Sequence, residues 1–480
     1  MGKHKKNQIR VSFVGNNAEG VTGSCSHIRT DIYQILLECG LHQSCTTPLN
    51  DYKINSAPFK FKSRDINYVF VGHNHIDHIG LIPKLYAQGC KAKIIAPKGT
   101  YEIAKILLED CAYIMSKDIE TIKRKTGKDY LPIYTSDDVK TCLEYWTEYD
   151  FDEVFNLSDN GENIAFKFTH SGHILNSAQL ELFLKQGNST KKILYTSDLG
   201  NIAVAKYYVG KFNKVKNANL VIGESTYCSG DRDIKSNCRE KDLEKIKSVI
   251  QQTCLEDNSK VLIPVFASDR CQNLLSHIYD LFHNDDNFKD IPVLVDSPMA
   301  VKICKAYLNL LEGEQLDKWQ KVMSWNNLKL VTDYETSKWY QEQNTPLVCL
   351  SCSGMLVSGR SLNWTAKLLP SPKNHILFCG FSPQGSLSYK IKQGKYKSLK
   401  IDGKMIPNRC QIVDLKSFSS HLQKNDLLNY YSEIQCEKIA LVHAEFDDKV
   451  KFAKELQEYI SKKNNTSKVV VVNKSTEILL

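Results

Sequence analysis

The sequence of 480 residues has no apolar run that approaches the roughly 20 residues of a membrane-spanning helix. Its first residues, Met1 to Lys6, do not open a charged-then-apolar secretory leader with a cleavage site. It also has no internal repeat and no low-complexity tract. These absences argue against a membrane protein, a solenoid and a disordered chain, and the 42% hydrophobic content indicates a globular protein of two or three domains.

The sixteen cysteines are scattered and do not form pairs at the spacing of a structural zinc site. Cys39, Cys349 and Cys379 lie in apolar surroundings, which is typical of small core residues. The close pair Cys349 and Cys352 has no partner pair, so it favours a strand and a loop over a zinc site. Because a secreted protein would use so many cysteines as disulfides, we expect reduced thiols in a cytoplasmic protein.

The excess of positive charge is modest. There are 63 Lys and Arg against 54 Asp and Glu, a net charge of +9, which suits a polyanionic partner but does not identify one. Two lysine-rich stretches, 123–128 and 390–400, could follow a phosphate backbone. A solvated lysine-rich face is the simpler interpretation of each stretch by itself.

Four metal-binding side chains fall within the six residues 73–78, directly after the apolar stretch 67–72. In an extended segment residues two apart point the same way, so His73 and His75 can bind one metal. Asp77 and His78, beyond a turn, can then face a second metal. Such a set suits zinc, with manganese or iron as alternatives because an oxygen ligand is present. A polar turn is the competing interpretation, but a satisfied core histidine is ordinarily solitary.

Three later strand-like stretches also end in side chains that could bind a metal. They are 164–169 before His170 and His173, 193–196 before Asp198, and 439–442 before His443. Side chains just past the ends of buried strands can converge on one site. Taken singly, each could be a capping aspartate or a surface histidine. Together with residues 73–78 they complete a dinuclear metal site.

With these motifs the chain resembles the metallo-β-lactamase superfamily, whose members carry a His-x-His-x-Asp-His motif, a Gly-His segment and a later bridging aspartate. Downstream, residues 224–227, 417–421 and 441–445 are similar to the three signature motifs of the β-CASP nucleases, and 264–270, 296–300 and 353–360 resemble other recurrent segments of that branch. The resemblance implies an α/β protein, in which a metallo-β-lactamase αββα sandwich contains an inserted β-CASP domain built on a parallel sheet. It places the active site in the cleft between domains.

The resemblance also implies a role for each residue of the site. One metal would be bound by His73, His75 and His173, the other by Asp77, His78 and His443, with Asp198 as the bridge. Two zinc ions, or manganese, would serve a metal-dependent ribonuclease that cuts internally, from the 5′ end, or both. His421, oriented by Glu224, would give a proton to the leaving oxygen, and Asp77 would join these two as a catalytic residue.

Two other functions stay open. A metallohydrolase of small esters, thioesters or lactams is argued against by the inserted domain and by Glu224, His421 and His443. An inactive RNA-binding partner would typically have lost metal ligands, and this chain keeps all seven. We expect single-stranded RNA as the substrate, with DNA left open because no residue visibly reads the 2′-hydroxyl. A homodimer is left open, and no membrane partner is expected.

Three positions depart from the family pattern: Glu38 stands where an aspartate is usual, and Asn176 and Ala444 stand where glycines are common. The added methylene of Glu38 could shift the ligand that it supports and alter activity or metal preference. Asn176 is expected to reshape the loop behind His173.

The resemblance implies that residues 1–208 and 399–480 are the two parts of the metallo-β-lactamase domain and that 209–398 form the inserted β-CASP domain. Short β-branched runs predict a sheet-rich first domain, covered by an amphipathic helix at 101–125. From Leu220 onward, strands and helices alternate, which builds a parallel sheet with helices on both faces. Strands at 411–413, 439–442 and 469–472, with a helix near 426–432, predict a tail that rejoins the first domain, because His443 is needed there.

Overall fold

The computed structural model describes residues 8–43, 47–157, 164–186, 189–202, 207–230, 238–357, 359–380, 382 and 385–480. The chain divides into two compact units. The first comprises residues 1–202, 209–232 and 420–480, and the second comprises 203–208 and 233–419. The domain limits 1–208, 209–398 and 399–480 stay a prediction.

The first unit contains two seven-stranded sheets. The first sheet has the order β22 (Glu477–Leu479), β1 (Arg10–Phe13), β2 (Ser26–Arg29), β3 (Gln34–Leu37), β4 (Tyr68–Phe70), β5 (Lys93–Pro97) and β6 (Trp146–Tyr149). The second has the order β21 (Lys468–Val471), β20 (Lys438–Val442), β11 (Leu220–Glu224), β10 (Ser189–Tyr195), β9 (Ala178–Gln186), β8 (Ile164–His170) and β7 (Phe155–Asn156). Each sheet is antiparallel in one part and parallel in the other, from β3 to β6 in the first and from β10 to β21 in the second.

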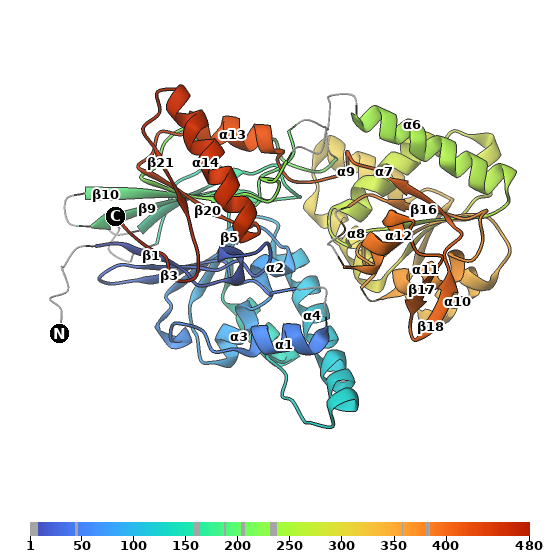
Figure 1. The fold of residues 1–480 in the computed structure, drawn as a ribbon, viewed down its shortest axis with the longest axis horizontal. Helices are drawn as coiled ribbons and strands as arrows, with labels where there is room; N and C mark the ends of the chain where they lie inside the picture. The colour runs from blue at the N-terminus through green and yellow to red at the C-terminus, as the bar shows by residue number, and fades with distance from the viewer. Residues whose placement is uncertain are drawn as a thin grey trace. The chain divides into compact units, whose positions relative to one another are not determined.

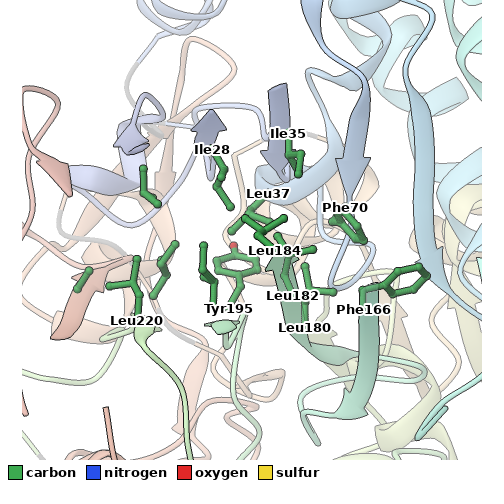
Figure 2. Close-up of a cluster of buried hydrophobic side chains, with 14 of the residues drawn as sticks. Ile28, Ile35, Leu37, Phe70, Phe166, Leu180, Leu182, Leu184, Tyr195 and Leu220 are labelled. Carbon is green, nitrogen blue, oxygen red and sulfur yellow. The ribbon is translucent and has the colours of Figure 1, made fainter. Parts of the chain in front are cut away.

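The two sheets pack face to face through a buried apolar layer, shown in Figure 2. Strand β9 places Leu180, Leu182 and Leu184 on this inner face, because side chains two residues apart point the same way in a strand. From the first sheet, Phe70 meets Phe166 edge to face, with ring centroids 5.3 Å apart. The alternating apolar pattern of these strands therefore fixes which face of each sheet is buried.

Helices cover the outer face of each sheet, so the first unit is an αββα sandwich (Figure 1). The first sheet is covered by α1 (Pro48–Ser56), α3 (Ile82–Ala87), α4 (Tyr101–Thr126) and α5 (Ser136–Glu144), and the second by α13 (Lys424–Glu433) and α14 (Phe446–Lys462). The helix predicted at 101–125 is confirmed as α4, which ends where Gly127 adopts φ +71°. None of the described helices is both long and apolar enough to cross a membrane.

The second unit is built on a six-stranded parallel sheet with helices on both faces (Figure 1). Its strand order is β14 (Leu328–Val331), β13 (Val293–Asp296), β15 (Leu347–Ser351), β12 (Lys260–Pro264), β16 (His375–Phe378) and β19 (Gln411–Asp414). The helices are α6 (Cys238–Gln251), α7 (Arg270–Phe282), α8 (Pro298–Leu310), α9 (Gly313–Met323), α10 (Tyr334–Glu342), α11 (Arg360–Leu368) and α12 (Leu387–Gln393), and a hairpin joins β17 (Ser398–Ile401) to β18 (Lys404–Pro407). The predicted alternation of strand and helix is confirmed.

One strand lies in a different sheet from the predicted one. Residues 411–413 do form a strand, β19. It pairs in parallel with β16 in the second unit and does not join either sheet of the first unit. A short apolar strand has the same pattern in either sheet, so only its pairing assigns it. The other two predicted strands, β20 and β21, do return to the first unit beside β11.

The described cysteines are free, and most are buried. Cys39, Cys349 and Cys379 lie in the core, as their apolar neighbours predicted. Cys349 lies on β15 and Cys352 just after it, which agrees with a strand and loop. Cys45 lies outside the described residues.

Candidate metal centre

The run from His73 to His78 lies where β4 ends and a short helix begins. His73 follows β4 by three residues, and His75 is still extended, with φ −62° and ψ 143°. Helix α2 (Ile76–Ile79) begins directly after it. Asp77 and His78 therefore project from the first turn of a helix, which is the turn that the sequence predicted after an extended segment.

Two glycines permit close backbone approaches beside this run. A Cβ atom at Gly40 would overlap the carbonyl group of Asp77, and a Cβ atom at Gly200 would overlap the carbonyl group of Gly172. Only glycine can occupy such positions without displacing the neighbouring backbone. The two contacts hold the segments that carry His78 and His173.

Three imidazoles and one carboxylate form a first group of candidate ligands: His73, His75, His173 and Asp198. Nδ1 of His75 lies 3.0 Å from Nε2 of His73 and 3.3 Å from Nε2 of His173. Oδ2 of Asp198 lies 3.5 Å from Nε2 of His73 and 3.6 Å from Nε2 of His173. The four side chains thus surround a single point.

A second group comprises Asp77, His78 and His443. Oδ2 of Asp77 lies 3.7 Å from Nε2 of His78 and 3.6 Å from Nε2 of His443. Asp198 reaches this group as well, since its Oδ2 lies 3.4 Å from His78 and its Oδ1 lies 3.7 Å from His443. All seven predicted ligands are therefore brought together, and Asp198 is the residue that both groups share.

His170, the remaining histidine considered from the sequence, does not join them. It is the last residue of β8, and its ring stacks on Phe151 with centroids 3.7 Å apart.

Four of the histidines have a polar partner behind the ring. Nδ1 contacts Ser197 Oγ in His73, Glu38 in His78, the Ser420 carbonyl oxygen in His173 and Thr226 Oγ1 in His443. Such a partner fixes the orientation of the ring and leaves the lone pair on the other nitrogen. In all four residues Nε2 is therefore the atom presented to the centre.

The buried nitrogens fit divalent metal ions. Among the described side chains, Nε2 of His78 and Nε2 of His443 are buried and have no hydrogen-bond partner. Burying a polar atom without a partner is costly, and a metal ion would supply that partner to both nitrogens. Nitrogen and carboxylate donors are the usual set for zinc in a hydrolase.

Burial keeps the rings of the first group neutral. It lowers the pKa of His73 and His173 well below the ordinary value of 6.5 and lowers that of His75 to about 4. Burial acts in the same direction on His78 and His443, but nearby carboxylates outweigh it and raise the pKa of both. The second group is thus the place where the protein favours a positive charge.

Both aspartates are held ionised by their histidine neighbours. Burial alone would raise the pKa of Asp77, but His78 and His443 lower it to about 2. For Asp198 burial again acts upward, and His443, His78 and His421 hold its pKa well below the usual range. Each carboxylate is therefore available as an anionic ligand at neutral pH.

Glu38 supports both groups through one buried carboxylate. Oε2 accepts from the Tyr195 hydroxyl at 2.5 Å and contacts Nδ1 of His78, while Oε1 accepts from Ser197 Oγ at 2.8 Å. Ser197 Oγ in turn contacts Nδ1 of His73 at 3.0 Å. Both oxygens of Glu38 therefore orient a histidine: Oε2 contacts His78 directly, and Oε1 acts on His73 through Ser197.

Asn176 does not need to be glycine in this loop. It has φ +58°, a left-handed conformation that asparagine tolerates better than most residues. The next residue, Ser177, accepts hydrogen bonds on Oγ from the backbone N–H groups of His173 and Ile174, at 3.0 and 3.1 Å. These bonds hold the loop that carries His173. Ala444 is buried, and nothing in the structure explains its choice over glycine.

His421 and Glu224 form the predicted pair beside the centre. Nδ1 of His421 lies 3.2 Å from Oε1 of Glu224, and its Nε2 lies 3.9 Å from Oδ2 of Asp198. Glu224 is buried and is itself fixed, since Oε1 accepts from the Leu199 N–H at 2.8 Å and Oε2 from the Thr226 N–H at 3.0 Å. The side chain of His421 is 18% exposed, so its Nε2 can meet a substrate.

Four supporting residues were missed from the sequence: Ser177, Tyr195, Ser197 and Thr226. All four carry a hydroxyl group and lie within four residues of a predicted ligand or of Glu224, and that proximity was the available signal. Tyr195 ends strand β10, three residues before Asp198. A hydroxyl beside a ligand is common, however, so this signal is weak.

Shortening Glu38 is expected to weaken metal binding. In Glu38→Asp the carboxylate would be withdrawn by one methylene and would lose contact with His78 or with the Tyr195 and Ser197 hydroxyls. We expect zinc affinity to fall by about 10- to 100-fold, as is typical when a partner behind a ligand is lost. Competition with a chromogenic chelator measures this, and Glu19→Asp, outside the centre, is the control. Unchanged affinity in Glu38→Asp would show that this chain does not use the added length.

The αββα sandwich with its ligands past the strand ends defines the metallo-β-lactamase fold. Residues 271–391 match the model of the Beta-Casp domain, and residues 405–467 match that of the Zn-dependent metallo-hydrolase RNA specificity domain. The chain is therefore similar to the β-CASP proteins of the metallo-β-lactamase fold over these two segments. The resemblance drawn from the motifs is thereby confirmed, as is the expected fold.

Curated relatives match along most of the chain. "Ribonuclease TTHA0252" of Thermus thermophilus is 28% identical over 89% of this chain and 91% of its own length. "Transcription termination factor FttA" of Methanocaldococcus jannaschii is 29% identical over 93% of this chain and 68% of its own. "Integrator complex subunit 11" of Danio rerio is 26% identical over 91% and 69%.

A solved structure has the same fold. A crystal structure described as a protein of unknown function from Enterococcus faecalis V583 has a TM-score of 0.52, with 98% of this chain and all of that chain covered. The two sequences are 11% identical, so this likeness concerns the fold alone.

Proposed function

We propose that the chain is a metal-dependent ribonuclease that hydrolyses RNA phosphodiester bonds at a dinuclear zinc site. One ion would be held by His73, His75 and His173, the other by Asp77, His78 and His443, with Asp198 between them. The observation that carries the proposal is the convergence of the other six side chains around Asp198, in which His73, His78, His173 and His443 each direct Nε2 inward.

Phosphodiester hydrolysis needs an activated water, neutralisation of the phosphate and a proton for the leaving oxygen. Two divalent ions would lower the pKa of the attacking water and neutralise the phosphate charge. His421 can deliver the proton through Nε2, because its Nδ1 faces Glu224. Glu224 orients the imidazole by holding Nδ1, which leaves Nε2 as the nitrogen that faces the leaving oxygen.

The similar proteins support RNA as the substrate. One matched model is described as an RNA specificity domain, and one relative is named a ribonuclease. The pair of Glu224 and His421 favours a nuclease over a small-substrate hydrolase, since it adds a proton donor beside the metal ligands. The full ligand set favours an active enzyme over an inactive RNA-binding partner.

Cleavage of end-labelled single-stranded RNA, beside DNA of the same sequence, tests the proposal. We expect RNA fragments when zinc or manganese is added and intact RNA when a chelator is present. Fragment sizes distinguish internal cutting from digestion at the 5′ end. Intact RNA in the presence of a protein with tightly bound zinc would contradict the proposal.

Acidification is expected to release the two ions in separate stages. Before metal binds, His78 and His443 have pKa values above 6.5, so protons compete for their Nε2 atoms near neutral pH. The pKa values of His73, His75 and His173 are lowered, that of His75 to about 4, so protons compete there only in stronger acid. Zinc per chain, measured by elemental analysis after dialysis at stepwise lower pH, should fall from about two equivalents to about one before it is lost entirely. A single step would contradict the assignment.

A further inference from the structure

A second candidate site lies at the edge of the first sheet that is opposite the metal centre. A hollow of about 540 Å³ is lined there by side chains that include Tyr33, Arg64, Tyr68, Lys91, Lys93 and Tyr149. Several of these residues stand at or just before the beginnings of β3, β4 and β5, whereas the first metal ligands follow the other end of β4. From Tyr68 to His73 an extended chain covers roughly 17 Å, so the hollow and the metal centre are separate sites.

The charge of the hollow is of one sign. Arg64, Lys91 and Lys93 are exposed, and none of them forms an ion pair with a carboxylate of the described residues. Nζ of Lys93 donates instead to the Tyr149 hydroxyl, at 2.9 Å. No Asp or Glu is among the described residues that line the hollow. Three cations without a counterion around a polar hollow form an attractive surface for a polyanion.

Three tyrosines give the hollow aromatic surfaces that are held in place. The rings of Tyr33 and Tyr68 meet at 53° with centroids 5.8 Å apart, and the Tyr68 hydroxyl donates to the Leu157 carbonyl oxygen at 3.3 Å. Tyr149 packs edge to face on the buried ring of Phe166, with centroids 4.9 Å apart. All three tyrosines are half-buried, so each is anchored on one side and accessible on the other.

We propose that this hollow binds a stretch of single-stranded RNA away from the point of cleavage. The inference rests on the proposed function, because it makes the hollow a second binding site for the same RNA substrate. Cations that contact phosphates together with aromatic rings that stack on bases are the combination by which proteins hold single strands without reading their sequence. An acidic peptide would satisfy the cations but would leave the three tyrosines unexplained.

The cations are tested by a triple variant and a matched control. Arg64→Gln, Lys91→Gln and Lys93→Gln remove three charges from the hollow. Lys454→Gln, Lys462→Gln and Lys468→Gln remove three exposed charges elsewhere in the first unit. Both sets are made in the full chain that also carries His421→Ala, so that RNA is not cut during the measurement. We expect the hollow variant alone to bind a long single-stranded RNA about tenfold more weakly, with a salt slope reduced by about 2.

The aromatic surface is tested by Tyr33→Leu and Tyr33→Phe. Tyr33→Leu should weaken RNA binding by about tenfold through lost stacking, and Tyr33→Phe, which keeps the ring, should restore it. If polyglutamate displaces RNA completely and Tyr33→Leu binds normally, the hollow is a general anion surface and the proposal is wrong. Unchanged RNA affinity and salt slope in the triple variant would also overturn it.

Cleavage assays separate this inference from the nuclease assignment. With an otherwise wild-type chain, the hollow variant should cleave an oligonucleotide of about four nucleotides normally, because so short a strand cannot reach both sites. Its KM for a long RNA should rise about tenfold, with kcat unchanged. A wild-type chain that binds RNA through the hollow without cleaving it refutes the nuclease alone. A wild-type chain that cleaves RNA while the triple variant keeps its full affinity refutes the hollow alone.

Discussion

Asp198→Ala is expected to lose both zinc ions and all measurable RNA cleavage. Oδ2 of Asp198 lies within 3.6 Å of the Nε2 atoms of His73, His78 and His173, and Oδ1 lies 3.7 Å from that of His443. Without this carboxylate, one group keeps three neutral imidazoles and no anion. The other group loses the oxygen that joins it to the first. Because the proposed chemistry uses both ions, activity should fall with metal content.

Elemental analysis of the purified variant, with cleavage assayed on the same sample, measures this effect. Asp290→Ala, which removes an exposed aspartate outside the centre, is the matched control and should keep both zinc and activity. Circular dichroism checks that the variant still folds. Zinc content equal to that of the unaltered chain would refute the bridging role of Asp198.

His421→Ala is expected to reduce cleavage by about 10²- to 10⁴-fold, the usual contribution of a positioned general acid. The metal content should not change, since His421 belongs to neither ligand group and its Nε2 lies 3.9 Å from Asp198. Glu224→Gln should have a smaller effect of the same kind, because the amide oxygen can still accept a hydrogen bond from Nδ1 but makes a weaker bond than a carboxylate does. The separation of activity from metal content is what distinguishes this residue from the seven ligands.

Single-turnover cleavage rates and elemental analysis on the same preparations test that separation. His283→Ala is the control, because His283 is an exposed histidine on the second unit. An RNA with an activated leaving group should lose less rate in His421→Ala than an ordinary RNA, since a good leaving group needs little protonation. If His421→Ala cleaves ordinary RNA at the full rate, His421 is not the proton donor.

The convergence of the candidate ligands could be predicted because metal chemistry restricts both residue type and position. Four ligands are adjacent in the sequence, and the other three each follow a buried strand, where parallel strands bring their ends together. The support behind the ligands could not be predicted as well. Tyr195 and Ser197 contact Glu38 across more than 150 positions of sequence, and no local pattern reports such a contact.

In the fold as well, elements with a local apolar pattern could be predicted, whereas pairings that depend on distant contacts could not. Elements with a strong apolar pattern, such as α4, β20 and β21, were predicted to within about one residue at each end. Helix α10 was missed because it lies on the surface and only Ser337 of its nine residues is buried. Helix α14 was also missed, although Phe452, Leu456 and Ile460 repeat every four residues on its buried face. The pairing of β19 with β16 depends on tertiary contacts, which a short apolar pattern does not specify.

The pairing of β1 with β22 has a consequence for the order in which the chain can assemble during translation. Arg10 faces Leu479 and Val11 faces Ile478. Strand β1 is synthesised first, and it cannot pair with β22 until residues more than 450 positions later have been made. His443 is also made long after the run that begins at His73. A nascent chain therefore carries an open sheet edge, and a set of candidate ligands that lacks only His443, while residues 233–419 of the second unit are synthesised. Until β22 has been made, the exposed edge of β1 is a site at which the nascent chain can pair with another chain.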